Sequence, residues 1–234
     1  MTDELDFETY LSISSKKIGI YLLDKRELKN LYFKEQNFES ENVFLDSYIL
    51  KKFLNNNIFK IEKLIGKFIK NITLIIDSEN ILLINVGLKK KNYENIVTKK
   101  FLENLLIDLK DLINENYQDY RIMHMHIINY LLDKNYFSEF NDSMNCKNLG
   151  IETQFISVPN SFIFEINKTL ENFHIKTAGY LNQNYIQSLF KEQKIGLSEM
   201  AYKSQLGYNA NEVSIIPKNV KKTGFFEKFF QLFS

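Results

Sequence analysis

The chain has 234 residues, 44% of them hydrophobic and 25% charged, which is typical of a folded globular protein with one large domain or two small ones. The formal net charge of +1 and the lack of a basic stripe outside the last residues argue against nucleic acid as a partner. The single cysteine excludes a disulfide within the chain, and no apolar run is long enough to span a membrane. The acidic first residues do not form a signal peptide, so we expect a cytoplasmic protein.

The first part of the chain predicts strands on either side of one long helical region. Asn55-Asn56-Asn57 is expected to interrupt that region, because asparagine is a poor residue for a helix interior. Ser78-Glu79-Asn80 would join the last two strands as a hairpin. The predicted elements are strands at 10–13, 18–23 and 28–33, a helix at 44–69 with an apolar stripe at Ile58, Ile61, Ile65 and Phe68, and strands at 72–76 and 81–88.

The second part of the chain contains the strongest helical pattern, which begins at Thr98, a plausible N-cap. Its apolar residues recur every three or four positions, as in a helix that packs one face on a sheet. Strands and helices then alternate until the pattern fades. The predicted elements are a helix at 98–114 with Phe101, Leu102, Leu105, Leu106, Leu109, Leu112 and Ile113 on one face, strands at 121–132 and 151–158, a helix from Pro159 that carries Phe162, Ile166, Leu170 and Phe173, a strand at 176–181 and a helix at 184–194.

Candidate catalytic residues are few. His124 and His126 lie two apart in a predicted strand, so both would project from one face. A metal site needs three or four ligands, and no second cluster supplies them, so we assign the pair to packing. His174 is expected to end a helix in the left-handed conformation, and Cys146 lacks the surroundings of a nucleophile. Because glycine-rich phosphate loops are also absent, the chain is expected to be a binding or tethering protein with no cofactor.

Residues 224–234 provide the clearest functional signal. Wound as a helix, they place aromatic side chains on one face and polar side chains on the other, after a basic approach, which is typical of a helix that lies in a membrane interface. About ten residues reach only ~15 Å and cannot span a hydrocarbon core of ~30 Å. The alternative is a terminal helix that docks on its own domain. The predicted membrane-binding residues are Lys221, Lys222, Phe225, Phe226, Lys228, Phe229, Phe230, Leu232 and Phe233.

The order of these elements resembles FtsA, the actin-like bacterial protein that anchors the division ring to the inner membrane. Residues 10–24 are similar to the family's opening phosphate-binding hairpin, and residues 44–88 are similar to the helix and hairpin that follow. Residues 121–133 resemble a strand of the family's inserted strand-helix-strand-strand module, and residues 165–175 resemble a later helix. Residues 221–234 resemble the family's amphipathic membrane-targeting tail.

The opening hairpin departs from the family pattern. Ser12 and Ser14 stand where the family has an acidic residue and a glycine, and Ser15 and Lys16 follow. Without the carboxylate, coordination of a metal–nucleotide complex is weakened, and without the glycine, close approach of the backbone to phosphate is impeded. These four residues therefore form a degenerate phosphate hairpin, and no bound nucleotide is expected.

The resemblance implies a reduced FtsA of the α+β class, with mixed sheets, packed helices, a partial actin-like lobe and the inserted module, but no complete ATPase fold. The domains would be an FtsA-like region at 1–200 with its inserted module at about 35–175, a linker at 201–222 and a membrane helix at 223–234.

The implied function is that of a non-catalytic cell division adaptor bound peripherally to the inner face of the cell membrane. Its partners would be anionic lipid, division proteins and further copies of itself. Direct binding to FtsZ is not expected, because the lobe that receives the FtsZ tail has no counterpart in this sequence. Two alternatives stay open, an adaptor of the PilM kind in type IV pilus assembly and a small metal-dependent enzyme that uses His124 and His126.

Overall fold

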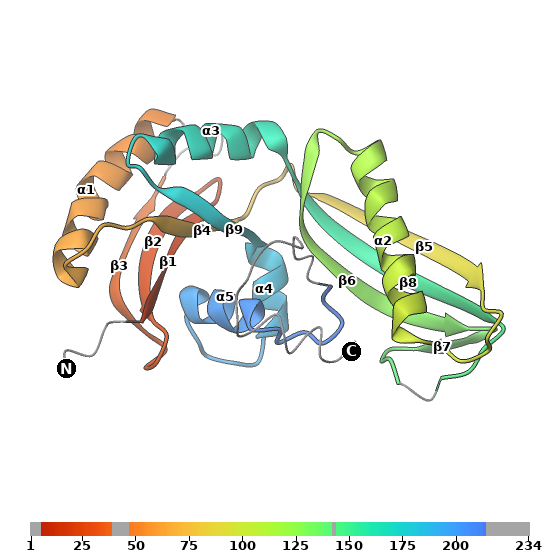
Figure 1. Ribbon diagram of the computed structural model, residues 1–234. Helices are drawn as coiled ribbons and strands as arrows, with labels where there is room; N and C mark the ends of the chain where they lie inside the picture. The colour runs from red at the N-terminus through yellow and green to blue at the C-terminus, as the bar shows by residue number, and fades with distance from the viewer. Residues whose placement is uncertain (1–5, 39–46, 142–143, 214–234) are drawn as a thin grey trace. The chain divides into compact units, whose positions relative to one another are not determined.

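The computed structural model divides the chain into two compact units, which we call unit 1 and unit 2 (Figure 1). Unit 2 is inserted into unit 1 between a strand and a helix. The insert is shorter than the predicted module at about 35–175, because the elements before Leu82 and after Val158 belong to unit 1. The structure describes residues 6–38, 47–141 and 144–213, of which unit 1 contains those up to Ile81 and Pro159–Tyr208, and unit 2 contains Leu82–Val158 and those from Asn209.

Unit 1 is built on a five-stranded mixed sheet with the order β3-β2-β1-β4-β9. The first three strands form an antiparallel meander, whereas β4 runs parallel to both β1 and β9. The carboxyl ends of β1, β4 and β9 therefore meet at one edge of the sheet. The strands span Phe7–Ile13 (β1), Lys17–Asp24 (β2), Lys29–Asn37 (β3), Asn71–Ile76 (β4) and Lys176–Asn182 (β9).

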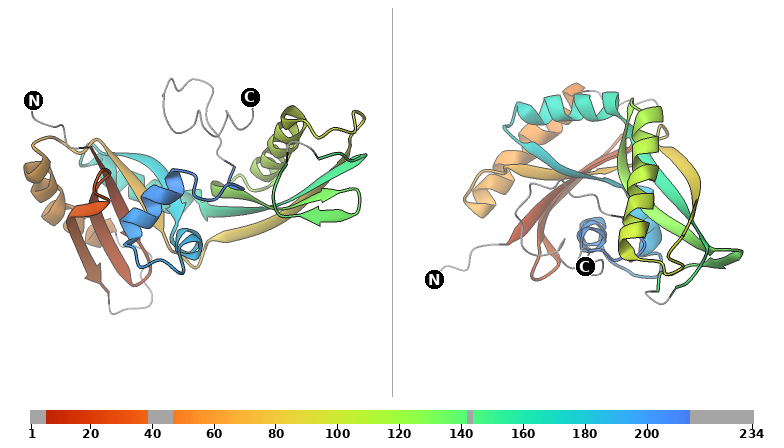
Figure 2. Two further views of the ribbon diagram at one scale, coloured as in Figure 1. Left: turned by 90° about the horizontal axis from the view of Figure 1, so that it is seen from below. Right: turned by 45° about the vertical axis from the view of Figure 1, so that its right-hand side comes forward.

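Helices cover both faces of this sheet. The strand register places Tyr10 and Tyr32 on opposite faces. Tyr32 donates a hydrogen bond to Oδ1 of Asn57 in α1 at 2.6 Å, and Tyr10 lies 2.7 Å from Oε1 of Gln205 in α5. Figure 2 shows α1 and α3 on one side of the sheet and α4 and α5 on the other. The helices span Ser47–Ile65 (α1), Asn160–Glu171 (α3), Gln183–Leu189 (α4) and Leu197–Gln205 (α5).

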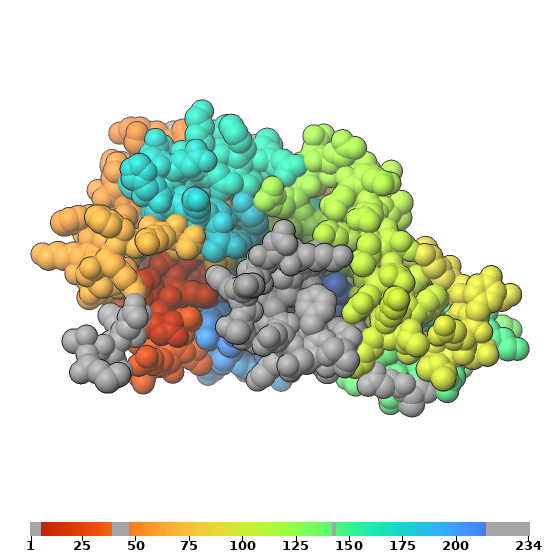
Figure 3. Space-filling view, in the orientation of Figure 1, coloured from red at the N-terminus to blue at the C-terminus, as the bar shows by residue number. Residues whose placement is uncertain are grey.

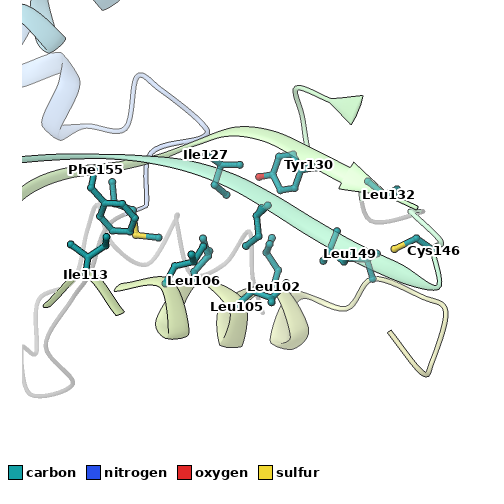
Figure 4. Packing of buried hydrophobic residues seen from close by; sticks show 14 residues of the cluster. Leu102, Leu105, Leu106, Ile113, Ile127, Tyr130, Leu132, Cys146, Leu149 and Phe155 are labelled. Carbon is teal, nitrogen blue, oxygen red and sulfur yellow. The ribbon is translucent and has the colours of Figure 1, made fainter. Parts of the chain in front are cut away.

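Unit 2 packs one helix, α2, on one face of a four-stranded sheet with the order β5-β8-β6-β7. The helix begins as predicted, because Thr98 accepts a hydrogen bond from the N–H of Phe101. Leu102, Leu105 and Leu109 lie in one buried cluster with apolar side chains of β6 and β8 (Figure 4). The elements span Leu82–Lys91 (β5), Lys99–Asn116 (α2), Tyr120–Leu132 (β6), Asn135–Phe137 (β7) and Asn148–Pro159 (β8).

The α+β class is confirmed. Each predicted strand and helix is present with somewhat different bounds, whereas β7 and α5 were not predicted. The predicted hairpin between residues 72–76 and 81–88 is wrong, because β4 pairs with β1 and β9 in unit 1, whereas β5 pairs with β8 in unit 2. The predicted break at Asn55-Asn56-Asn57 is also wrong. Helix α1 continues through these residues, since the buried Asn57 donates to the carbonyl of Phe53 and accepts from Tyr32.

The predicted linker at 201–222 begins inside folded structure. Helix α5 extends to Gln205, with Ala201 fully buried. After it, the N–H of Ile127 donates to the carbonyl of Asn211 at 2.9 Å, and the N–H of Val213 donates to the carbonyl of Met125 at 2.7 Å. This short pairing adds the last described residues to strand β6, so the chain enters its C-terminal segment from unit 2.

Candidate functional site

The carboxyl ends of β1, β4 and β9 carry a group of polar residues. Asp77 follows β4 and donates its N–H to the carbonyl of Ile13 at 2.9 Å, which ties the end of β4 to the end of β1. Asn184, in α4, donates from Nδ2 to Oδ1 of Asp77 at 3.1 Å. In sheets with parallel strands, this is the edge at which ligands usually bind. It is also the edge next to the degenerate phosphate hairpin.

The turn of that hairpin uses its polar groups internally. Ser14 donates from its N–H to the carbonyl of Lys17 at 2.8 Å, and its hydroxyl donates to the same carbonyl at 3.1 Å. The hydroxyl also accepts from the N–H of Lys17 at 3.0 Å. The carbonyl of Lys16 accepts from the N–H of Phe38 at 2.8 Å, so the turn is tied to the end of β3 as well. Ser15 is half-buried, and Lys16 is exposed.

Ser12 is buried under Tyr21. Its hydroxyl lies 3.5 Å from the Tyr21 hydroxyl, and both groups occupy the space that a side chain at Gly19 would need. A Cβ atom at Gly19 would come within 2.7 Å of each of these oxygens. Tyr21 in turn hydrogen-bonds Glu35, which also accepts from Nζ of Lys17 at 3.0 Å. A line of polar contacts thus joins β1, β2 and β3 on the face of the sheet that α4 and α5 cover.

The electrostatics of this line follow from burial and hydrogen bonding. Burial raises the pKa of the Tyr21 phenol, and its hydrogen bond to Glu35 raises the pKa further, so the phenol stays protonated and donates. Burial opposes ionisation of Glu35, but hydrogen bonds from Tyr21 and Lys17 hold its pKa below the usual value. The Glu35 carboxylate therefore accepts hydrogen bonds from Tyr21 and Lys17, and the Ser12 hydroxyl is buried within the protein.

His124 and His126 project from one side of β6, as the sequence predicted. His124 is buried, and its Nδ1 lies 2.6 Å from Oε1 of Glu212. Burial lowers the pKa of His126, with His124 lowering it further and Glu212 opposing the shift. Across the described parts of the chain, no three histidine, cysteine, aspartate or glutamate side chains are grouped so that they could hold a metal ion.

The two remaining candidates have structural surroundings. His174 adopts a φ of 56°, the left-handed conformation expected after a helix. The next N–H, of Ile175, reaches back to the carbonyl of Leu170 at 3.2 Å and completes the end of α3. Cys146 is buried in the core of unit 2, where burial raises the pKa of its thiol. A raised pKa reduces the thiolate fraction, so the thiol is a poor nucleophile.

The predicted membrane-binding residues lie outside the described residues. They are Lys221, Lys222, Phe225, Phe226, Lys228, Phe229, Phe230, Leu232 and Phe233. Within residues 6–38, 47–141 and 144–213, no helix is both long enough and apolar enough to cross a membrane.

A surface on α1 is a further possible site, which the sequence did not indicate. Exposed lysines, two asparagines and an exposed phenylalanine lie there, next to the outer strand β3. The sequence feature that could have indicated this surface is the run Asn55-Asn56-Asn57, from which a helix break was expected instead. In the space-filling view, α1 (orange) and α3 (teal) form neighbouring parts of the surface of unit 1 (Figure 3).

Solved structures with a similar fold exist. A chain of the PilM–PilN type IV pilus biogenesis complex matches with a TM-score of 0.51 and 6% identity, over 80% of this chain and 52% of that chain. The cytoplasmic domain of EpsL, an inner membrane component of the type II secretion system of Vibrio cholerae, matches with a TM-score of 0.40 and 10% identity, over 77% and 59% of the two chains. A Bacteroides thetaiotaomicron protein of unknown function with an actin-like ATPase fold has a TM-score of 0.37 and 14% identity, over 84% and 61%.

These likenesses concern the fold. The chain spans about half the length of the PilM–PilN chain that it matches. No family model matches the sequence, and no curated protein matches it either. The comparisons support an actin-like fold, as the sequence resemblance implied, and they do not single out the FtsA family within it.

Proposed function

We propose that this protein is a non-catalytic adaptor of actin-like fold that holds protein partners at the inner face of a membrane. The observation that carries the proposal is the β1–β2 hairpin. Where the family that the sequence resembles has an acidic residue, Ser12 is buried under Tyr21, and the hydroxyl of Ser14 is bonded to Lys17. A phosphate-binding hairpin needs backbone and side-chain groups that face the ligand, and here the N–H and the hydroxyl of Ser14 bond Lys17 instead.

Two kinds of assembly are candidates for the partners. The fold likeness to a chain of the PilM–PilN type IV pilus biogenesis complex favours a pilus-type assembly. The resemblance of residues 221–234 to the FtsA tail favours a division assembly, in which the protein would contact division proteins or copies of itself. Gene neighbourhood separates the two, because pilus genes next to this gene support the first and FtsZ and cell-wall synthesis genes support the second.

Titration calorimetry with Mg-ATP tests the expectation that the protein does not bind ATP. The full chain should give no saturable heat at micromolar protein concentration, whereas an ATP-binding actin-like protein measured in parallel gives a binding curve. Micromolar affinity for Mg-ATP would show that the hairpin rearranges to accept phosphate and would overturn this part of the proposal.

Membrane association is tested by co-sedimentation with anionic and neutral vesicles. Each aromatic side chain at the interface contributes part of the ~1.5–3 kcal/mol of full burial, ordering of the helix offsets some of it, and each nearby lysine adds ~1 kcal/mol on an anionic surface. We expect binding to anionic vesicles that weakens with salt. Deletion of residues 223–234, or Phe226→Glu with Phe230→Glu, should release the protein into the supernatant.

A matched control keeps the membrane test specific. Phe164→Glu with Tyr136→Glu also places two charges on exposed aromatic positions, but in α3 and β7. This variant should pellet with anionic vesicles as the wild type does. If both tail variants still pellet, the tail is not the anchor. If the deletion lowers the melting temperature by more than ~5 °C, the tail belongs to the folded core.

A further inference from the structure

A hollow of about 450 Å³ opens on unit 1 between α1 and the outer strand β3. Its floor includes the buried Phe53 and Asn57, and its rim includes the exposed Phe59. Within the described residues, β3 pairs only with β2, so its other edge is available for backbone hydrogen bonds. The described residues that line it are Lys34, Gln36, Phe53, Asn55, Asn56, Asn57, Phe59 and Lys60.

The asparagines in this lining are unusual for their position. Each asparagine inside a helix costs a few tenths of a kcal/mol relative to alanine. Asn57 has a structural reason, since it joins α1 to Tyr32 of β3. Asn55 and Asn56 are exposed and line the hollow, beside a phenylalanine that is 71% exposed. Residues that weaken a helix are often found where the protein has a function. Side-chain amides can hydrogen-bond a peptide backbone through both their N–H donors and their oxygen acceptor.

The charge of the hollow is positive. Among the described residues, Lys34 and Lys60 line it, and no carboxylate does. Glu35, next to Lys34 on β3, points to the opposite face of the sheet, where Tyr21 and Lys17 bind it. Lys52 and Lys63 extend the positive charge along the exposed side of α1. A neighbouring hollow between α1 and α3 is smaller, at about 140 Å³, and contains Glu165, so it lacks this character.

We propose that this hollow binds an extended acidic segment of a partner protein, laid along the free edge of β3. Strand addition at a sheet edge supplies main-chain hydrogen bonds, and alternate side chains of the added segment point into the flanking hollow. There, acidic side chains meet Lys34 and Lys60, apolar side chains contact Phe59, and Asn55 and Asn56 bond the remaining polar groups. An anionic membrane is the weaker match, because a flat surface leaves a recess and a strand edge unused.

This hollow would be a partner-binding surface of the proposed adaptor. The inference depends on the proposed function in one respect, which is that the protein binds a protein partner. It is tested with the full chain and a short fluorescein-labelled peptide in which glutamate alternates with valine. A lysine–valine peptide of the same length is the control probe. Fluorescence anisotropy should show binding of the acidic probe only, with affinity that falls as salt is added. Amide NMR shifts should map to β3 and to the side chains of Asn55 and Asn56.

Variants locate the site. Lys34→Glu with Lys60→Glu should weaken binding of the acidic probe about tenfold, since each reversal removes an attraction and adds a repulsion. Asn55→Ala with Asn56→Ala should weaken it less while stabilising the helix, so a loss of affinity cannot come from unfolding. The matched control is Lys99→Glu with Lys110→Glu, which reverses two lysines of α2 in unit 2 and should leave binding unchanged.

Three outcomes would overturn the inference. They are equal binding of both probes, equal loss of affinity in the α2 control, and loss of vesicle binding rather than peptide binding in the Lys34 and Lys60 variant. The last outcome would assign the surface to an anionic membrane. The two peptide outcomes do not depend on the tail, because peptide binding is measured without vesicles. Failure of the tail experiments would therefore leave this inference standing, and its failure would leave the membrane proposal standing.

Discussion

Strand β2 of unit 1 and the edge strand β5 of unit 2 are buried differently. In unit 1, helices cover both faces, and all residues from Ile18 to Leu23 in β2 are buried. In unit 2, α2 covers one face, and β5 alternates between partly buried and exposed positions from Leu82 to Lys89. A strand enclosed on both faces thus carries a continuous buried run, whereas the edge strand β5, with one open face, carries an alternating pattern. Added volume should therefore be costly on either face of β2 but, in β5, only on the face under α2.

The largest expected effect is the loss of apolar contacts under α2. Leu105→Ala or Leu109→Ala should lower the free energy of unfolding by ~2–5 kcal/mol, because both side chains are fully buried in the core of unit 2. Leu112→Ala, on the same helix but 44% exposed, should cost less than ~1 kcal/mol. Chemical denaturation measures the free energies, and hydrogen exchange should show the loss of protection concentrated in unit 2. Equal costs at Leu105 and Leu112 would contradict the observed packing.

A glycine in each sheet tests the contrast directly. Gly19→Ala in β2 should destabilise unit 1 by ~1–3 kcal/mol, because the added Cβ would lie within 2.7 Å of the Ser12 and Tyr21 hydroxyls. Gly87→Ala in β5 should be neutral or slightly stabilising, because the nearest atom, Cγ of Glu152, would be 3.8 Å away. Thermal unfolding of the two variants gives the comparison. A Gly87 variant as unstable as the Gly19 variant would mean that the open face of unit 2 is covered.

Removing the Tyr21 hydroxyl should have a smaller effect, of ~1 kcal/mol, since it deprives Glu35 of a donor and Ser12 of its neighbour. The pKa of Glu35 is lowered in the folded protein, so its contribution to stability is present above the unfolded pKa of ~4.3 and is lost as the pH falls through the folded value. The gap between wild type and Tyr21→Phe should therefore narrow in acid. Urea titrations at neutral and acidic pH measure the gap, and a gap that widens in acid would refute this account.

The smallest expected effect is a pH dependence in unit 2. The pKa of His126 is lowered by burial, so below ~6.5 the unfolded chain binds a proton that the folded chain resists. Stability should thus fall by a few tenths of a kcal/mol or more as the pH drops from neutral through this range. His126→Gln should reduce that fall, while His174→Gln, in unit 1, serves as the control for a histidine outside β6. A fall that is unchanged in the His126 variant would place its origin elsewhere.

Local patterns predicted the elements that depend on local physics. The spacing of Leu102, Leu105 and Leu109 and the cap at Thr98 were sufficient for α2, since helix geometry and capping involve residues close in sequence. The left-handed conformation of His174 was predicted for the same reason. The hairpin of β1 and β2 was predicted as a structure, and its serines were identified as a departure from a phosphate site.

The partners of the strands could not be predicted in this way. Residues 72–76 and 81–88 were expected to pair with each other because they are neighbours in sequence, but they belong to different sheets. The sequence also did not show that Tyr21 would cover Ser12, or that residues 211–213 would pair with β6. In each case the contact joins residues that are distant in sequence or on separate strands, and only the folded sheet fixes their register.

The sequence alone determined most of the strands and helices of this protein, because hydrophobic spacing and caps act over a few residues, but it did not predict β7 or α5. The tertiary structure decided which strands share a sheet and which polar groups of the hairpin form hydrogen bonds within the protein. It also decided that Asn57 is buried in α1 and bonded to Tyr32, whereas Asn55 and Asn56 are exposed. The physical reason is that burial and hydrogen-bond satisfaction are properties of the assembled sheet and its covering helices, so the same residue type is a structural link at one position and a free surface group two positions away.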